Sequence, residues 1–277
     1  MTKARITPPC PELVNAADSI GQRLKGKRVL LTGTTKGVGV AAQELFARHG
    51  AYVIGSGRTP GVAAANAAKI AALGLKAEGY DVDLSDPDAA KAWVDMAAER
   101  MGGIDVVVNN ASKPEFAPFG VMTFEQWKKS LQNELDLVFT VTNAAWPHLI
   151  KAGGGSVINV SSNNGTTGIG NTPQAAHAAA KAGVIGLAKQ LAAEGAPFGI
   201  RVNALSPGLI ETPGSGGAPP EMVNFIVNEM QLTGRPLTPL DVAYGLLFLA
   251  SDESRFITAI NLPLDGGSSG AMPGPNF

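Results

Sequence analysis

A histidine and a lysine four residues apart are the side chains best suited to chemistry in this sequence. His177 and Lys181 are separated by three alanines, and this spacing places both side chains on one face of a helix. An imidazole with a pKa near ~6.5 is a competent acid or base at neutral pH. Ser161 and Ser162 end an apolar run upstream, where they either cap a sheet edge or supply a hydroxyl. These residue types could exchange a proton, whereas a lone histidine on a helix usually has no special role.

A glycine-rich loop near the N-terminus could bind phosphate. The segment Thr32–Gly39 (TGTTKGVG) follows an apolar run and opens a helical pattern. Its glycines, Gly33, Gly37 and Gly39, allow a sharp turn and close approach of a ligand, and a helix N-terminus attracts phosphate. An isolated match of this kind is as often a plain tight turn. Its place in the first strand–helix unit favours a dinucleotide.

Two cations indicate which dinucleotide. Lys36 lies in the loop, and Arg58 follows the second predicted strand. Proteins that prefer NAD usually place an acidic residue at that position, whereas Gly57 and Arg58 stand here. Cations at both positions suit the additional 2′-phosphate of NADP, although they could also be ordinary surface charges. We expect NADP rather than NAD.

Strand-like and helix-like patterns alternate along the chain. Strands that are apolar on both faces and are separated by helices predict an α/β fold with a parallel sheet covered on two sides. The expected strands are Arg28–Thr32, Tyr52–Ser56, Asp105–Val108, Ser156–Val160, Arg201–Leu205 and Ile260–Leu264. The expected helices are Val38–His49, Val62–Leu73, Phe124–Ile150, Ala175–Ala193 and Pro239–Ala250.

Composition restricts the classes of protein that fit. The 277 residues are 45% hydrophobic and 16% charged, which suits one globular domain. We expect an N-terminal arm (1–26), a domain (27–267) and a C-terminal tail (268–277), with a mobile lid at 214–220. A net charge of −1 argues against a nucleic-acid partner. No apolar run reaches membrane-spanning length, and the single cysteine, Cys10, fits a reducing, cytoplasmic location.

Several motifs, in order along the chain, resemble the short-chain dehydrogenase/reductase family. TGTTKGVG is similar to its TGxxxGxG loop, and NNAS (109–112) to its NNAG motif, with Ser112 in place of glycine. DLSD (83–86), VINVSS (157–162), RVNALSPGLIET (201–212), FLASD (248–252) and DGG (265–267) match further family segments. Each motif is modest alone, but the set is specific.

The resemblance implies one Rossmann-type, doubly wound sheet of about seven parallel strands with helices on both faces. It also implies cofactor contacts for residues along the chain. Those expected to bind NADP are Gly33, Thr35, Lys36, Gly37, Val38, Gly39, Arg58, Asp83, Leu84, Asn110, Lys181, Pro207, Gly208, Ile210 and Thr212. Family members are usually homotetramers or dimers built from the two long helices, so we expect a homo-oligomer.

The family's catalytic helix carries a YxxxK motif, and this chain departs from it. The tyrosine donates the proton, the lysine lowers the tyrosine pKa and binds the ribose, and a serine polarises the carbonyl. Here His177 stands in place of the tyrosine, whereas Lys181 and Ser162 are present. The family's supporting Asn aligns with Glu134. Asn133 precedes it, and a slip of one residue would turn that side chain by roughly 100°.

Three functions remain open from the sequence. The first is an NADP(H)-dependent oxidoreductase that interconverts a small-molecule carbonyl and alcohol, with His177 as proton donor and Glu134 as its partner. Because an imidazole reaches roughly 2 Å less than a phenol by bond-length counting, the substrate would sit deeper or a water would bridge. The others are a non-redox lyase or isomerase on this scaffold, and a catalytically silent protein that binds cofactor.

Overall fold

Seven parallel strands form one sheet in the computed structural model, which describes residues 22–170, 172–211 and 220–271. The strand order is β3-β2-β1-β4-β5-β6-β7, so the chain reverses its direction of winding between β1 and β4. The strands are β1 (Arg28–Thr32), β2 (Tyr52–Gly57), β3 (Ala77–Asp81), β4 (Val106–Asn109), β5 (Gly155–Val160), β6 (Ile200–Pro207) and β7 (Asn261–Leu264). The fold expected from the sequence is confirmed.

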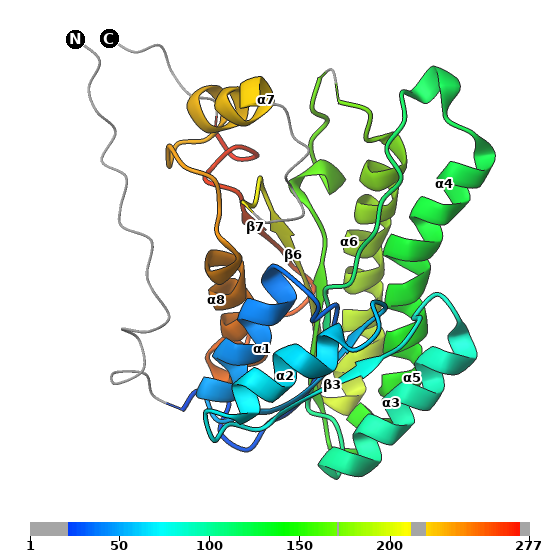
Figure 1. Cartoon of the computed structure of the whole chain (residues 1–277), viewed down its shortest axis with the longest axis vertical. Helices are drawn as coiled ribbons and strands as arrows, with labels where there is room; N and C mark the ends of the chain where they lie inside the picture. The colour runs from blue at the N-terminus through cyan, green and yellow to red at the C-terminus, as the bar shows by residue number, and fades with distance from the viewer. Residues whose placement is uncertain (1–21, 171, 212–219, 272–277) are drawn as a thin grey trace.

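Helices cover both faces of the sheet, as Figure 1 shows. One face carries α1 (Val38–Arg48), α2 (Val62–Ala71) and α8 (Pro239–Ala250), whose apolar side chains form one core with the strands. The other face carries α3 (Pro87–Met101), α5 (Leu137–Lys151) and α6 (Ala175–Gly195), which form a second core. Because both faces are buried, the central strands are apolar throughout, and this explains their clear signal in the sequence.

The expected strands and helices did not include β3 and α3. The strand β3 reads AEGYD and lies at the sheet edge, where it is only partly buried, so it lacks the continuous apolar run of the central strands. α3 begins with Pro87 at its first turn, and the Asp86 side chain accepts hydrogen bonds from two backbone N–H groups of that turn. These are ordinary helix-start signals, and the helix was identifiable from them.

The long helix predicted at Phe124–Ile150 is interrupted. The structure has α4 (Phe124–Leu131), a π-helical turn (Gln132–Asp136) and then α5. A π-helical turn adds a residue to the helix, and such turns are frequent at functional sites. Here Glu134 lies within the turn and is fully buried.

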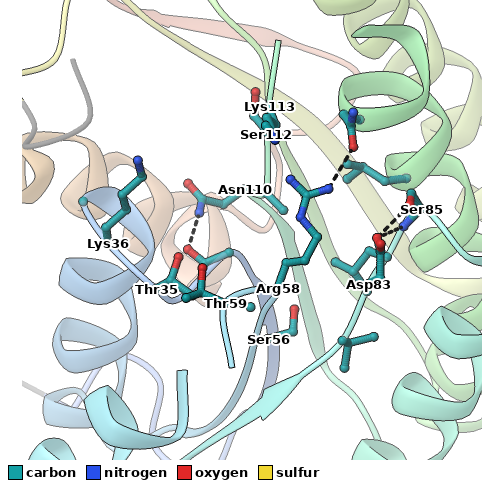
Figure 2. Close-up of a pocket in the computed structure, with 18 of the residues that line it drawn as sticks. Thr35, Lys36, Ser56, Arg58, Thr59, Asp83, Ser85, Asn110, Ser112 and Lys113 are labelled. Atoms are coloured by element: carbon teal, nitrogen blue, oxygen red, sulfur yellow. Dashed lines mark hydrogen bonds between the residues drawn. The ribbon is translucent and has the colours of Figure 1, made fainter. Parts of the chain in front are cut away.

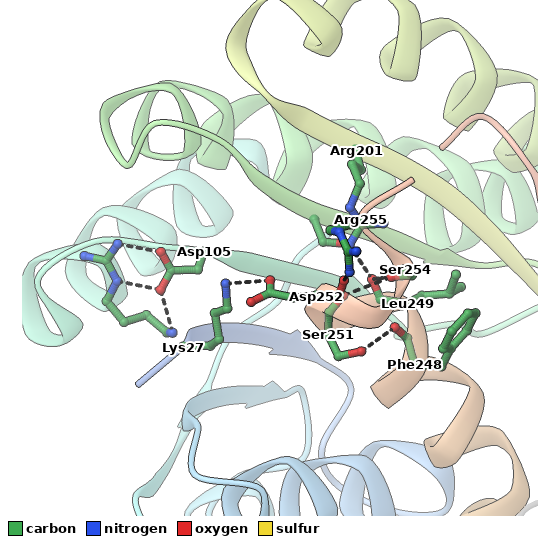
Figure 3. A network of polar contacts seen from close by, with 11 residues as sticks. Lys27, Asp105, Arg201, Phe248, Leu249, Ser251, Asp252, Ser254 and Arg255 are labelled. Atoms are coloured by element: carbon green, nitrogen blue, oxygen red, sulfur yellow. Dashed lines mark hydrogen bonds and ion pairs between the residues drawn. The ribbon is translucent and has the colours of Figure 1, made fainter. Parts of the chain in front are cut away.

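Ion pairs tie the amino ends of the strands together, at the end of the sheet opposite to the carboxyl ends (Figure 3). Arg28 at the start of β1 pairs with Asp105 at 2.7 Å, and Lys27 pairs with Asp252 at 3.1 Å. Arg201 donates to the backbone carbonyls of Leu249 and Ile257. These contacts link β1, β6 and the end of α8, so they serve the fold rather than the carboxyl-end site.

The expected arm and lid lie largely outside the described residues. Within the part of the arm that is described, residues 22–26, Leu24 is fully buried and belongs to the core, so this end of the arm packs on the domain. Residues 214–219 of the expected lid fall outside the described ranges. After them the chain forms α7 (Pro220–Phe225) and a second π-helical turn, Ile226–Met230.

Candidate active site

A cavity of about 600 Å³ opens at the carboxyl ends of β1, β2 and β4 (Figure 2). This is the point where the strand order reverses, and ligands of open α/β sheets bind at such switch points. Its lining combines the glycine-rich loop with segments that follow β2, β3 and β4. Among the residues expected to bind cofactor, it includes Gly33, Thr35, Lys36, Gly37, Val38, Arg58, Asp83, Leu84 and Asn110.

The glycine-rich loop is compact because two of its glycines touch backbone. A Cβ at Gly39 would lie 2.0 Å from the Gly33 carbonyl oxygen, and Gly33 itself has a φ of +79°. Gly37 is the N-cap of α1 and no side chain caps this helix start, and both Gly37 and Val38 line the cavity. The loop therefore has the shape and the donors that a phosphate needs.

Two asparagines brace this loop. The Asn110 amide donates to the carbonyls of Thr32 and Gly33 at 3.0 and 3.2 Å. Asn66 of α2 donates to the carbonyls of Thr34 and Thr35, both at 3.1 Å. Asn66 was not among the predicted site residues, and nothing in its alanine-rich surroundings distinguished it.

The cationic and acidic side chains expected at the adenosine end line the cavity. Arg58 is exposed and its guanidinium lies 3.5 Å from the Asn133 side-chain oxygen. Asp83 accepts from both the hydroxyl and the backbone N–H of Ser85 (Figure 2). These hydrogen bonds, the hydroxyl first, hold the pKa of the Asp83 carboxyl below its usual value.

The segment expected at the nicotinamide follows β6. Gly208 lies so close to Asp265 that a Cβ would be 3.0 Å from the Asp265 Cα, and its N–H donates to the Leu264 carbonyl. Pro207 ends β6, and Ile210 forms an isolated bridge with Leu237. Thr212 lies outside the described residues.

His177 and Glu134 form a hydrogen-bonded pair. The Nδ1 of His177 lies 2.9 Å from Oε1 and 3.0 Å from Oε2 of Glu134. The Glu134 side chain is fully buried, and that of His177 is 14% exposed. The ring of Phe116 meets the imidazole edge-on, with centroids 6.0 Å apart. Two residues 43 apart in sequence are thus joined by the packing of α6 on the π-helical turn.

Lys181 completes a charged cluster. Its Nζ lies 3.7 Å from Glu134 Oε1 and donates to the Val160 carbonyl at 3.0 Å. Burial lowers the pKa of Lys181, and the carboxylate of Glu134 opposes that effect. Burial would raise the pKa of Glu134, but the hydrogen bond from His177 and the charge of Lys181 outweigh it, so this pKa lies below its usual value. Glu134 is therefore ionised at neutral pH.

Ser162 lies next to this cluster but is hydrogen-bonded within its own turn. Its hydroxyl accepts from the Asn164 N–H at 3.2 Å and donates to the Asn163 side chain at 3.3 Å. The preceding Ser161 donates to the Lys181 carbonyl at 2.8 Å. The turn that carries Ser162 is thereby attached to α6 at the level of Lys181.

In the structure Glu134 thus contacts both His177 and Lys181. A further residue that was not among the predicted site residues joins this cluster. The hydroxyl of Ser112 donates to Glu134 Oε1 at 2.5 Å. The signal for Ser112 was present, since it departs from the glycine of the NNAG motif.

A doubly wound parallel sheet, with a glycine-rich loop at its switch point and a Lys-containing cluster on α6, defines a dinucleotide-binding enzyme fold of the Rossmann type. Residues 33–269 match the family model described as enoyl-(acyl carrier protein) reductase. The chain belongs to the short-chain dehydrogenase/reductase family.

Relatives and solved structures agree with this assignment. The chain is 39% identical over 246 residues to 3-oxoacyl-(acyl-carrier-protein) reductase of Thermotoga maritima, covering 88% of this chain and 98% of the relative. It is 35% identical over 253 residues to 2,5-dichloro-2,5-cyclohexadiene-1,4-diol dehydrogenase of Sphingobium indicum, covering 90% and 99%. A crystal structure of short-chain dehydrogenase/reductase type from Burkholderia xenovorans superposes with a TM-score of 0.85 at 30% identity, covering 92% of this chain and all of that one.

The described part of the chain contains neither a cluster of metal-binding residues nor a membrane-spanning helix. Its residues contain no group of three or more His, Cys, Asp or Glu side chains placed to hold a metal ion. Its helices include none long and apolar enough to cross a membrane.

Proposed function

We propose that this protein is an NADP(H)-dependent oxidoreductase that interconverts a carbonyl and an alcohol on a small molecule, with His177 exchanging the proton. The observation that carries the proposal is the contact of His177 Nδ1 with the buried carboxylate of Glu134, at 2.9 Å, beside Lys181. Burying the charge of Glu134 is costly unless that charge is paired. A histidine that had replaced the tyrosine by chance would not be accompanied by such a buried, ionised partner.

The residues at the cavity fit a dinucleotide with a 2′-phosphate. Gly33 and Gly39 let the loop close tightly on itself, since a Cβ at either position would collide with neighbouring backbone, and the α1 N-terminus would offer N–H groups to the diphosphate. Arg58 and Lys36 are exposed cations on the cavity wall, where they can pair with the additional phosphate. When bound, the cofactor supplies or accepts the hydride.

The proton route follows from the charge state of Glu134. An ionised carboxylate only accepts hydrogen bonds, so Nδ1 of His177 must carry a proton. Nε2 is then the ring nitrogen that exchanges a proton with the substrate oxygen. It accepts that proton when an alcohol is oxidised, and it donates from the imidazolium when a carbonyl is reduced. Glu134 stabilises the imidazolium and fixes the ring orientation, as the carboxylate does in other His–carboxylate pairs.

Lys181 and Ser162 have separate roles in this scheme. The Lys181 ammonium, held by the Val160 carbonyl, would orient the cofactor ribose and balance the charge of Glu134. Ser162 would bind the substrate oxygen once its hydroxyl turns away from Asn163. Pro207, Gly208, Ile210 and Thr212 would surround the nicotinamide.

The relatives support this class of reaction. Their names describe a 3-oxoacyl reductase, a cyclohexadiene-diol dehydrogenase and an acetoacetyl-CoA reductase, all of which act where a carbonyl and a hydroxyl interconvert. We further propose a homo-oligomer in the cytoplasm. The 57% exposure of Phe139 on α5 is consistent with an interface on that helix.

The test is turnover by the full chain with NADPH and a panel of ketones, and with NADP and the corresponding alcohols. We expect His177→Ala to lower kcat by about 10²-fold or more, the usual size of a general acid–base contribution. His148→Ala is the matched control, since His148 pairs with Asp95 at 2.7 Å, away from the site. Full activity in His177→Ala would refute the assigned role.

The same assays separate the two alternative functions. Product formed without any change in nicotinamide absorbance would favour a lyase or isomerase. Tight NADPH binding without turnover would favour a catalytically silent protein.

A further inference from the structure

The three positions at which this chain departs from the family motifs lie in one hydrogen-bonded group. Ser112 replaces the glycine of NNAG, Glu134 the asparagine and His177 the tyrosine. Ser112 and His177 each contact Glu134. We propose that Ser112 is a positioning residue, whose hydroxyl holds the Glu134 carboxylate in the orientation that keeps the proton of His177 on Nδ1. This inference rests on the proposed role of His177.

Hydrogen-bond contacts to both oxygens hold the Glu134 carboxylate in one orientation. Oε1 of Glu134 accepts from the Ser112 hydroxyl at 2.5 Å and lies 2.9 Å from His177 Nδ1. Oε2 lies 3.0 Å from the same nitrogen. A carboxylate can rotate about its last side-chain bond, which has a broad torsional preference. His177 and Lys181 both approach the carboxylate from α6, whereas Ser112 approaches it from the segment after β4. Donors from these two elements together fix the rotation.

The donor itself is held by the backbone that precedes it. The N–H groups of Asn110 and Ala111 both donate to the Thr32 hydroxyl oxygen at 2.9 Å. Ser112 therefore follows a segment tied to the end of β1. A hydroxyl on such an anchored segment is in place before the ligand binds, as a positioning contact requires.

The difference in burial between Ser112 and Glu134 also supports a positioning role for Ser112. Ser112 is exposed on the cavity wall, and Glu134 is fully buried behind it. An exposed serine can satisfy its hydroxyl with water, yet this one donates inward to the carboxylate. Ser112 thus lines the cavity and at the same time contacts the carboxylate that is hydrogen-bonded to His177. Besides Ser112, the charged or titratable groups that face Glu134 are His177 and Lys181, both on α6.

The experiment compares Ser112→Gly, Ser112→Ala and Ser112→Thr in the full chain carrying ¹⁵N-labelled histidine. Only three histidines are present, so His177 is assigned by its loss in His177→Gln. We expect one tautomer, protonated on Nδ1, with a slowly exchanging proton in the wild type and in Ser112→Thr, which keeps the hydroxyl. In Ser112→Gly and Ser112→Ala we expect mixed tautomers and exchange of that proton at least about tenfold faster, as for a lost charge-assisted hydrogen bond.

Ser85→Ala is the matched control. Ser85 lines the same cavity and donates to the carboxylate of Asp83 at 2.7 Å, without contact to the His177 pair, so the His177 resonances should not change. In kinetics, Ser112→Ala should lower kcat about tenfold, and Ser112→Thr should restore most of it. An unaltered tautomer and exchange rate in Ser112→Ala would overturn the proposal. Because the spectra need no turnover, this outcome is separate from failure of the proposed function.

Discussion

Gly165 lies directly against the backbone of Lys181. A Cβ at position 165 would be 2.9 Å from the Lys181 carbonyl carbon and 3.0 Å from the nitrogen of Ala182. The turn that carries Ser162 therefore rests on α6 at the point where Lys181 leaves the helix. A second close approach lies at Gly183, where a Cβ would be 2.9 Å from the Leu135 side chain, so α6 packs directly on the π-helical turn there. Two glycines thus set the spacing among Ser162, Lys181 and Glu134.

Gly165→Ala should push the Ser162 turn away from α6. We expect kcat to fall at least about tenfold, since small displacements of reacting groups are costly, and stability to fall by about 1–3 kcal/mol from overpacking. Kinetics and urea unfolding measure the two effects. Gly168→Ala is the control, because a Cβ at Gly168 meets nothing within 4 Å. Equal behaviour of the two variants would contradict the importance of this contact.

Glu134→Gln should keep the shape of the side chain and remove its charge. The amide can donate to Nδ1 and favour the wrong tautomer of His177, so kcat should fall by about 10³-fold or more, as for a comparable change in a catalytic triad. Lys181 would lose its buried partner, at a cost of about 3 kcal/mol. Glu125→Gln, which breaks the exposed pair with Lys128, is the control and should change neither quantity appreciably.

The lowered pKa of Glu134 makes a prediction about acid stability. Its value in the folded chain lies below the ordinary 4.5, so the unfolded chain binds more protons in that interval. The stabilisation is therefore fully present above pH 4.5 and is lost as the pH falls through the folded pKa. Urea unfolding at pH 7, 5, 4 and 3 should show the gap between wild type and Glu134→Gln closing below pH 4.5. A gap that stays constant with pH would refute the assignment.

Arg58→Ala should weaken the proposed preference for the phosphorylated cofactor. Because the variant loses a charge-assisted contact, we expect its KM for NADPH to rise about tenfold and its KM for NADH to stay nearly unchanged. The ratio of the two values is the measurement. Lys69→Ala removes an exposed charge from α2, away from the cavity lining, and should leave that ratio as it is. If Arg58→Ala raises both values equally, Arg58 does not read the 2′-phosphate.

The sequence predicted the central strands and their covering helices because burial on both faces leaves continuous apolar runs. It did not reveal β3, whose edge position tolerates Glu78 and Tyr80, nor the π-helical turn. A π-helical turn and an α-helix share nearly the same apolar pattern over a few residues, so Phe124–Ile150 read as one helix. Family resemblance located Glu134, His177 and Lys181. Their mutual contacts depend on how α6 packs on the turn, which sequence spacing does not determine.

The π-helical turn also changes how far α4 is rotated about the helix axis relative to α5. Each residue of an α-helix advances by about 100°, so one extra residue turns everything on the far side by that angle. Deletion of a single residue from Gln132–Asp136 would restore a continuous helix and leave α5 in place against the sheet. The same deletion would swing α4 and the loop before it around the helix axis. A change of one residue in the π-helical turn would thus change the orientation of α4 and of the loop before it, while the core around α5 stays the same.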